Sequence, residues 1–138
     1  MNKSEILAFL NANPSCHLAT VEGNKPHARG MGMYKADENG IIFQTWYRKD
    51  LHKQLSENPN VELCFNNFKE GFQIRVSGTM ELVEDMELKK EIMAKRKRLK
   101  PFLEQVGYEG VAIYNLKKGV ATVWSFETNF APKTYIKL

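Results

Sequence analysis

The sequence has few cysteines and no long apolar run. Its 138 residues include only Cys16 and Cys64. No stretch approaches the roughly 18 apolar residues that a membrane span requires. Charge also interrupts the apolar positions of MNKSEILAFL at the N-terminus, unlike the core of a secretory signal. We therefore expect a cytoplasmic protein without a membrane partner, whose two thiols are reduced, buried and inert.

Motifs for catalysis by side chains alone are also missing. His17, His27 and His52 do not have the spacing of a zinc site, and two cysteines are too few for a thiolate site. The chain contains no nucleophile elbow, Walker A loop or dinucleotide-binding glycine fingerprint. We expect no metal site, and the sequence assigns no catalytic residue. A cofactor would have to supply any redox chemistry.

Composition and length are those of an ordinary globular domain. Hydrophobic residues make up 43% of the chain and charged residues 26%, and the net charge is +4. Residues 1–138 are expected to form a single domain, because no linker, repeat or low-complexity segment divides them. The mild excess of positive charge is compatible with a phosphorylated ligand, with nucleic acid, or with no specific partner.

Hydrophobic periodicity and turn residues predict a mostly β protein with flanking helices. Frequent hairpin turns and few crossover helices indicate an antiparallel sheet that is closed or nearly closed into a barrel. The expected elements are a helix over residues 2–13, three strands over 16–46, a helix over 49–59, strands over 61–67 and 72–83, a helical run over 84–106 that Pro101 breaks, and short strands over 110–116, 119–126 and 133–138.

The stretch PHARGMGMYK, residues 26–35, is predicted as a strand with two glycines on one face. Strand alternation places Gly30 and Gly32 together and puts Arg29 and Met31 on the opposite face. Two glycines weaken a strand, but they leave bare backbone that a flat ligand can approach closely. A bulge or a tight bend of the barrel would use the same residues.

The stretch QTWYRKDLHKQL, residues 44–55, gathers cations around a helix start, where the helix dipole disfavours them. The cations are Arg48, Lys49 and Lys53. Together with the Thr45 hydroxyl and the free amides of a helix start, they could bind a phosphate. A solvated charged face explains them equally well, since Asp50 lies beside them and Lys53 could pair with Glu57.

A second basic run, KRKRLK at residues 95–100, could indicate nucleic-acid binding. Acidic residues precede it on the same helical segment, and acid at a helix start with base at its end is what the dipole favours. We therefore interpret the run as a solvated helix end and expect no nucleic-acid partner.

The order of these motifs resembles a known family. HLATVEGNKPHARGM, IIFQTWYRKDLHKQLSENPNVELCF and FQIRVSGTMELV are similar to the pyridoxamine 5′-phosphate oxidase-like flavoproteins of the FMN-binding split-barrel superfamily, and in particular to small bacterial members related to nitroimidazole-resistance reductases. The likeness spans about residues 15–84. It implies a six-stranded antiparallel Greek-key split barrel that forms a homodimer, with two FMN molecules in the interface grooves.

The resemblance also implies site residues. Arg29, Gly30 and Met31 would contact the flavin ring or the ribityl phosphate. The phosphate ligands would be Thr45, Lys49 and Lys53, with Trp46 nearby. The strand after the turn would supply Gln73 as a polar contact to the flavin, and Trp124 would approach the ring near the dimer interface.

Two features depart from the true oxidase. Asp50 and Leu51 stand where the oxidase pattern has an adjacent Arg-Lys pair, and the chain has no counterpart of the oxidase's C-terminal substrate segment. The sequence therefore predicts a flavoprotein that passes electrons from a nicotinamide donor, NADH or NADPH, to a small acceptor such as a nitroaromatic or a quinone. The alternative is a non-enzymatic carrier or sensor of flavin or haem, since family members also use haem or deazaflavin.

Overall fold

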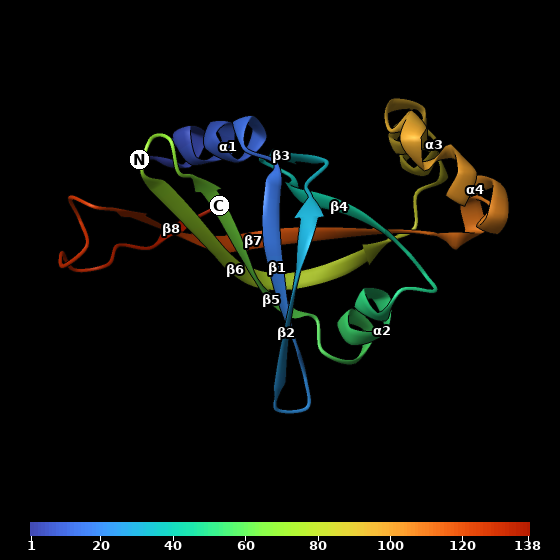
Figure 1. The fold of residues 1–138 in the computed structure, drawn as a ribbon, viewed down its shortest axis with the longest axis horizontal. Coiled ribbons are helices and arrows are strands. Elements are labelled where there is room, and N and C mark those ends of the chain that lie inside the picture. The colour runs from blue at the N-terminus through green and yellow to red at the C-terminus, as the bar shows by residue number, and fades with distance from the viewer.

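The computed structural model describes residues 1–138 as one curved antiparallel sheet with helices at its margins (Figure 1). The elements are α1 (Lys3–Ala12), β1 (Ser15–Glu22), β2 (Lys25–Gly32), β3 (Lys35–Asp37), β4 (Gly40–Trp46), α2 (Asp50–Glu57), β5 (Asn60–Asn67), β6 (Phe72–Val83), α3 (Met86–Lys95), α4 (Lys100–Val106), β7 (Val111–Ser125) and β8 (Ile136–Lys137). Short 3₁₀ turns at Lys97–Leu99 and Tyr108–Gly110 flank α4.

The strand order is β2-β1-β5-β6-β7-β4-β3, with β8 paired to β7, and every pairing is antiparallel. The predicted class, mostly β with flanking helices, is confirmed. Six strands have seven residues or more, which matches the predicted number, and the short β3 and β8 bring the total to eight. Strand β2 stands at one end of this order, so one of its edges has no neighbouring strand.

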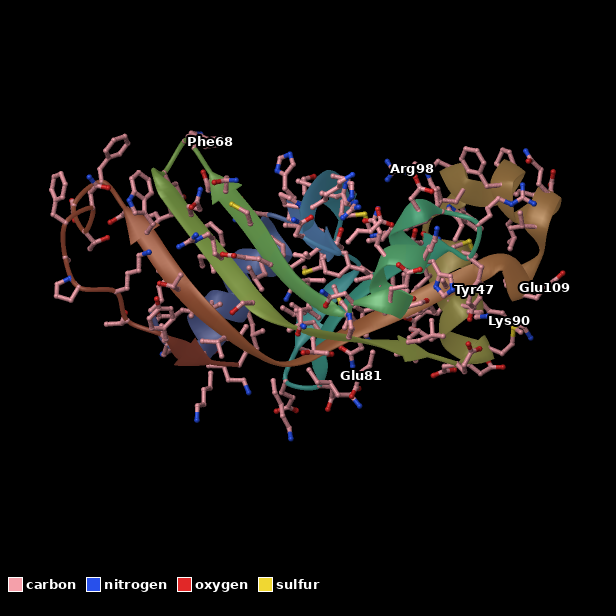
Figure 2. The ribbon with its side chains drawn as sticks, turned by 90° about the horizontal axis from the view of Figure 1, so that it is seen from below. Tyr47, Phe68, Glu81, Lys90, Arg98 and Glu109 are labelled. Atoms are coloured by element: carbon pink, nitrogen blue, oxygen red, sulfur yellow. The ribbon has the colours of Figure 1, made fainter.

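The core consists of two hydrophobic clusters, a larger one that packs α1 and α2 against the sheet and a smaller one that packs α3 against β4 and β7. Its largest fully buried side chains include Phe65, Leu63 and Ile74 from the central strands, and Ile6 and Leu10 of α1 pack against them. Helix α1 covers one side of the sheet, α2 lies next to the β1–β2 hairpin, and α3 and α4 stand at the far end (Figure 1). Figure 2 shows the same separation: Lys90, Arg98 and Glu109 lie at the helical end, and Phe68 lies toward the opposite end.

Residues 16–46 form four strands rather than the predicted three. The stretch predicted as one strand over 26–35 ends at Gly32. The chain then passes between strands: the amide of Met33 donates to Pro14 O at 2.9 Å, and that of Tyr34 donates to Ile42 O at 2.8 Å. This change of partner starts the additional short strand β3. The strand could not be predicted from the local sequence, because it depends on the pairing between strands.

The prediction of separate strands over 110–116 and 119–126 is wrong, because β7 runs unbroken through both. Lys118 adopts a positive φ of 54°, and the pairing with β6 shifts register opposite Gly78. A Cβ on Gly119 would lie 2.6 Å from Leu116 Cδ2 of the same strand and 2.8 Å from Val76 Cγ1 of β6, so glycine allows the two strands to pack closely at this irregularity. Lys117, Lys118 and Gly119 therefore form a bulge inside one strand rather than a turn between two.

The helical run predicted over 84–106 is interrupted earlier than expected. Helix α3 ends at Lys95 with Arg96 as its C-cap, and Pro101 lies in the first turn of α4 instead of causing the break. The Asp85 side chain caps α3 by accepting from the amide of Leu88 at 3.1 Å. Glu87 in the first turn and Lys95 in the last turn give α3 the expected charge order. The longest helices have ten residues, so none could span a bilayer.

The two cysteines differ in their surroundings. Both thiols are free, and Cys16 is buried as predicted. Cys64 is only half-buried on the outer face of the sheet, so the prediction that it is buried is wrong. Burial raises the pKa of the Cys16 thiol to about 12, and the nearby Cys64 acts in the same direction.

The raised pKa of Cys16 makes stability sensitive to alkaline pH. The unfolded chain gives up this proton near pH 9, whereas the folded chain keeps it until about pH 12. We expect the Cys16 contribution to the free energy of unfolding to be complete below pH 9 and to be lost as the pH rises toward 12. Urea unfolding between pH 8 and 10.5 would measure the slope. Cys16→Ala should flatten it relative to Cys64→Ala, and equal slopes in the two variants would contradict the assignment.

Candidate cofactor-binding groove

An open groove of about 420 Å³ lies between the edge strand β2 and the start of α2. Its volume falls within the roughly 300–1,000 Å³ usual for small-molecule sites. Five of the eight residues predicted to bind the cofactor line it, namely Arg29, Gly30, Met31, Thr45 and Lys49. The structure therefore brings together residues from β2, from the end of β4 and from the start of α2.

Strand β2 offers the groove an unobstructed backbone. Its side chains alternate as predicted: Arg29 and Met31 are half-buried on the core side, whereas Gly30 and Gly32 are exposed. As the edge strand, β2 leaves the backbone groups that do not pair with β1 free to bind other partners. A Cβ built on Gly30 would meet no atom within 4 Å, so no contact within the chain requires glycine there.

The open space at Gly30 allows an effect on ligand binding to be separated from an effect on stability. Gly30→Val should leave the unfolding temperature of the cofactor-free protein unchanged or slightly higher, because valine suits a strand better than glycine. If a flavin lies along β2, the same change should weaken its binding by about tenfold, since Gly30 lines the groove. Thermal unfolding and flavin titration of one preparation would measure both effects. Unaltered flavin binding would show that the ligand does not approach this part of β2.

Arg29 is anchored by a polar cluster beneath the groove. Its Nη1 donates to Thr20 Oγ1 at 2.9 Å and to Leu18 O at 3.2 Å, and its Nη2 donates to Gln54 Oε1. Three of the five guanidinium N–H groups are thus used, which leaves two for a ligand. Partial burial lowers the pKa of Arg29, and the Asp50 carboxylate opposes that shift.

The start of α2 adds a free cation and a hydroxyl. Lys49 is the N-cap residue, and its side chain forms neither a capping bond nor a salt bridge. The Thr45 side chain is nearly buried, and its hydroxyl makes no hydrogen bond within the chain. Asp50 also lines the groove and offsets part of the positive charge. Arg29 and Lys49 thus supply two positive charges against the one carboxylate of Asp50, and hydrogen-bond donors remain unused. This arrangement fits a ligand that carries a phosphate.

The other three predicted residues lie outside this groove. Trp46 lines a smaller adjoining pocket, and Lys53 is exposed one turn further along α2. Lys53 does not form the alternative ion pair with Glu57.

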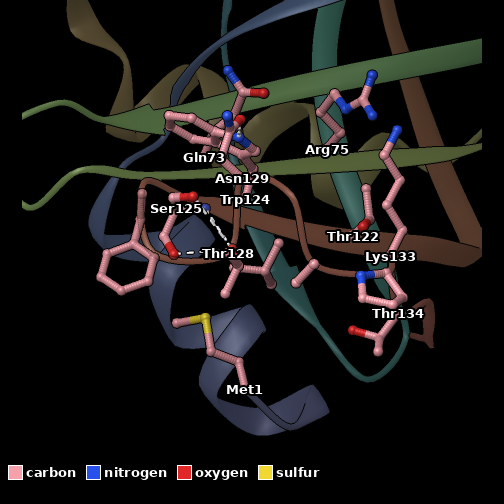
Figure 3. Close-up of a pocket in the computed structure, with 14 residues that line it drawn as sticks. Met1, Gln73, Arg75, Thr122, Trp124, Ser125, Thr128, Asn129, Lys133 and Thr134 are labelled. Carbon is pink, nitrogen blue, oxygen red and sulfur yellow. Dashed lines mark hydrogen bonds between the residues drawn. The ribbon is translucent and has the colours of Figure 1, made fainter.

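Gln73 lies on β6 in a separate hollow of about 570 Å³ (Figure 3). Its Nε2 donates to Asn66 Oδ1 at 2.9 Å. Trp124 lines the same hollow, and its indole N–H donates to Asn129 Oδ1 at 2.9 Å. Within one chain, the predicted flavin contacts therefore lie in two separate sites, the groove beside β2 and the hollow lined by Gln73 and Trp124.

Sequence reasoning missed Gln54, which ties α2 to the sheet. Its side-chain oxygen accepts from Thr20 Oγ1 at 2.6 Å as well as from Arg29, and only 7% of the residue is exposed. A signal was present, because Gln54 shares the buried helix face with Leu51 and Leu55. A polar residue at a buried helical position indicates a bonded partner in the core.

The groove has few groups for proton transfer. His27 lines it, with Nε2 lying 3.4 Å from Glu22 Oε1 and making no hydrogen bond. His52 lies elsewhere, with Nδ1 at 2.6 Å from the Tyr114 hydroxyl. No group of three or more His, Cys, Asp or Glu side chains is arranged to hold a metal ion. The groove can hold and orient an anionic ligand, and any redox chemistry would come from that ligand.

Fold and groove together define a mostly antiparallel β domain with an edge-strand site for a phosphorylated small molecule. Residues 3–110 match the family model described as pyridoxamine 5′-phosphate oxidase. The chain belongs to the pyridoxamine 5′-phosphate oxidase family, and the resemblance noted in the sequence is confirmed.

Two curated relatives agree with this assignment. General stress protein 26 of Bacillus subtilis is 30% identical over 99 residues, which cover 68% of this chain and 69% of that protein. The pyridoxine/pyridoxamine 5′-phosphate oxidase of Burkholderia mallei is 38% identical over 71 residues, or 51% of this chain. The match spans only 33% of that oxidase's own length.

Solved structures share the fold. A NimC/NimA family protein from Clostridium acetobutylicum has a TM-score of 0.80 at 26% identity, and the match covers 98% of this chain and 92% of that one. A pyridoxamine 5′-phosphate oxidase-related, FMN-binding protein from Nostoc punctiforme has a TM-score of 0.68 at 20% identity, with 96% and 87% covered. The predicted split-barrel class is thereby confirmed.

Proposed function

We propose that the chain is an FMN-binding oxidoreductase. The observation that carries the proposal is the single groove in which the bare backbone of β2 faces Thr45 and Lys49 at the start of α2. Support also comes from the family assignment and from the description of the Nostoc punctiforme protein as FMN binding. One phosphate and one flat ring system match the two parts of this groove.

The chain's own residues would hold the cofactor by charge and by backbone contacts. Lys49, the two free N–H groups of Arg29 and the Thr45 hydroxyl would bind the phosphate, while the backbone at Gly30 and Met31 would lie along the ring. When bound, FMN would supply the redox chemistry, the transfer of two electrons as a hydride from a nicotinamide donor to a small acceptor. A quinone acceptor would also take up two protons, one derived from the hydride and one from water. Donors fixed near the ring would stabilise the negative charge of the reduced flavin.

We further propose a homodimer through the outer face of the sheet. Cross-strand pairing aligns Gly30, His17, Cys64 and Arg75 in one row across β2, β1, β5 and β6. Ala19 in the neighbouring row pairs with Glu62, whose carboxylate lies 3.4 Å from Arg75, and none of these residues is buried within the single chain. A face that combines short side chains with an arginine–glutamate pair can meet its own symmetry copy in an isologous contact.

The dimer would also join the two separate places in one site. Gln73 and Trp124 line a hollow away from the groove of their own chain. In the proposed dimer, Gln73 of the partner subunit and Trp124 of the partner subunit would complete the flavin site. This arrangement accounts for their separation from Lys49 within one chain.

The visible spectrum of the purified protein tests the proposal. Absorbance of oxidised flavin, released as FMN on denaturation, is the expected result. A Soret band would instead indicate haem. A colourless protein that also fails to bind added FMN would overturn the proposal.

Anaerobic mixing with NADH or NADPH separates the enzyme from the alternative, a flavin carrier or sensor without turnover. Bleaching of the flavin followed by recovery on addition of a quinone or nitroaromatic is expected for the enzyme. No bleaching with either donor would favour the carrier.

A further inference from the structure

A second pocket, of about 220 Å³, adjoins the candidate flavin groove. Three of its lining residues, Trp46, Arg48 and Lys49, come from the segment that links β4 to α2. The opposite wall is the face of α4 that carries Phe102, Gln105 and Val106. Because Lys49 lines both the pocket and the groove, the two openings are neighbours.

The pocket presents aromatic surface to solvent. The ring centroids of Trp46 and Phe102 are 6.1 Å apart at an interplanar angle of 62°, an edge-to-face pair. Phe102 is 52% exposed although it is a large apolar residue. Exposed aromatic rings beside cations are the usual surface for stacking a nucleotide base.

Free cations stand at the same opening. Neither Arg48 nor Lys49 forms a salt bridge, and both are among the residues that line the pocket. The planar guanidinium of arginine suits bidentate binding of a phosphate. The pocket therefore combines a place for a flat ring with a place for a phosphate monoester.

The two walls of the pocket are tied together by Tyr47, which lies between Trp46 and Arg48 in the chain. The Tyr47 amide donates to Gly110 O at 3.0 Å, just beyond α4, and its hydroxyl donates to Glu84 Oε1 at 2.5 Å, just before α3. Burial and this bond to Glu84 raise the pKa of Tyr47 to about 12, so the hydroxyl stays protonated and bonded at neutral pH. The pocket is thus formed before any ligand binds.

We propose that this pocket binds the adenine ring and the 2′-phosphate of NADPH, with the ring against Trp46 and Phe102 and the phosphate on Arg48. A volume of about 220 Å³ is below the roughly 300–1,000 Å³ of a site for a whole ligand, so only one end of a dinucleotide enters it. The rest of the donor extends past Lys49 toward the flavin groove. The inference rests on the proposed function and deepens it by selecting NADPH over NADH.

Calorimetric titration of the FMN-loaded protein tests this site without relying on turnover. The probes are adenosine 2′,5′-bisphosphate and 5′-AMP, which differ by the 2′-phosphate and lack nicotinamide. We expect the bisphosphate to bind at least about tenfold more tightly, the scale of one charge-assisted contact. Arg48→Ala should abolish that difference in affinity, and Phe102→Ala should weaken the binding of both probes.

Arg98→Ala is the matched control, because Arg98 is an exposed cation near α4 that does not line the pocket. The control should bind both probes as the unmodified protein does. Equal affinity for the two probes, or an equal loss in Arg48→Ala and Arg98→Ala, would overturn the inference.

Flavin content is read from the absorbance spectrum before each titration. If the unmodified protein does not bind FMN, the proposed function is overturned. If it binds FMN but does not select the probe with the 2′-phosphate, only the inference is overturned. In steady-state assays, Arg48→Ala should raise the KM for NADPH about tenfold, change the KM for NADH little, and leave FMN affinity unchanged. Equal changes in the two KM values would count against the site.

Discussion

Replacement of Lys49 by alanine is expected to lower FMN affinity by about 10- to 100-fold, or roughly 1.5–3 kcal/mol, the range of a hydrogen bond to a charged group. The reason is geometric, since Lys49 lines the groove and has no carboxylate partner to hold it elsewhere. Quenching of flavin fluorescence on titration with protein would give the dissociation constants. All variants should be compared at one salt concentration, because ionic strength screens such contacts.

Lys53→Ala provides a control with the same change of charge. The sequence predicts Lys53 as a phosphate ligand alongside Lys49, but the structure places it outside the groove lining. We expect a loss of less than about threefold for Lys53→Ala, since an exposed cation at a distance contributes little. Equal losses of FMN affinity in the two variants would show that Lys53 also binds the phosphate. Unchanged FMN affinity in Lys49→Ala would show that the phosphate does not bind at the start of α2.

Ala19→Arg is expected to shift the proposed dimer toward monomers. Ala19 lies on the outer sheet face opposite Ala28, and this face is open in the single chain. Ala19 pairs with Glu62, whose carboxylate already lies 3.4 Å from Arg75, so Glu62 would offset only part of the cost of desolvating a bulky guanidinium in the interface. We expect dimer affinity to fall by at least about tenfold. Light scattering coupled to size-exclusion chromatography would measure the mass.

The same variant should also bind FMN more weakly if the partner subunit completes the site. Ala94→Arg is the control, because it adds the same charge on the exposed surface of α3, away from the sheet face. A monomeric Ala19→Arg variant with full flavin affinity would show that one chain holds the cofactor alone. A variant that stays dimeric would place the interface on another face.

Local patterns in the sequence were sufficient to predict most of the elements. Helix α1 ends before Pro14, the buried Leu51 and Leu55 face of α2 follows helical periodicity, and β6 has the predicted bounds. Each of these elements is determined by near neighbours in the chain. The unbroken β7 could not be predicted in this way, because Lys118 and Gly119 have the composition of a turn and only pairing with β6 makes them a bulge.

The same distinction applies to the site. Arg29 with Gly30, and Thr45 with Lys49, were predicted as two short segments, and the structure brings these segments into one groove. The place of Gln54 on the buried face of α2 indicates a bonded partner, but not that the partner is Thr20, 34 residues away. Gln73 lies in a different hollow of the single chain, and a site shared between two subunits, as proposed, is not encoded in any local pattern of one sequence.

The free edge of β2 would give the proposed cofactor a role in solubility as well as in electron transfer. An uncovered edge strand can pair with the edge of another molecule, and the one inward-pointing charge of β2, Arg29, is held by bonds to Leu18, Thr20 and Gln54 rather than exposed along the edge. A flavin seated along that edge would cap it as a neighbouring strand does. The supply of riboflavin would then govern how much of the protein remains dispersed rather than self-associated, before any electron is transferred.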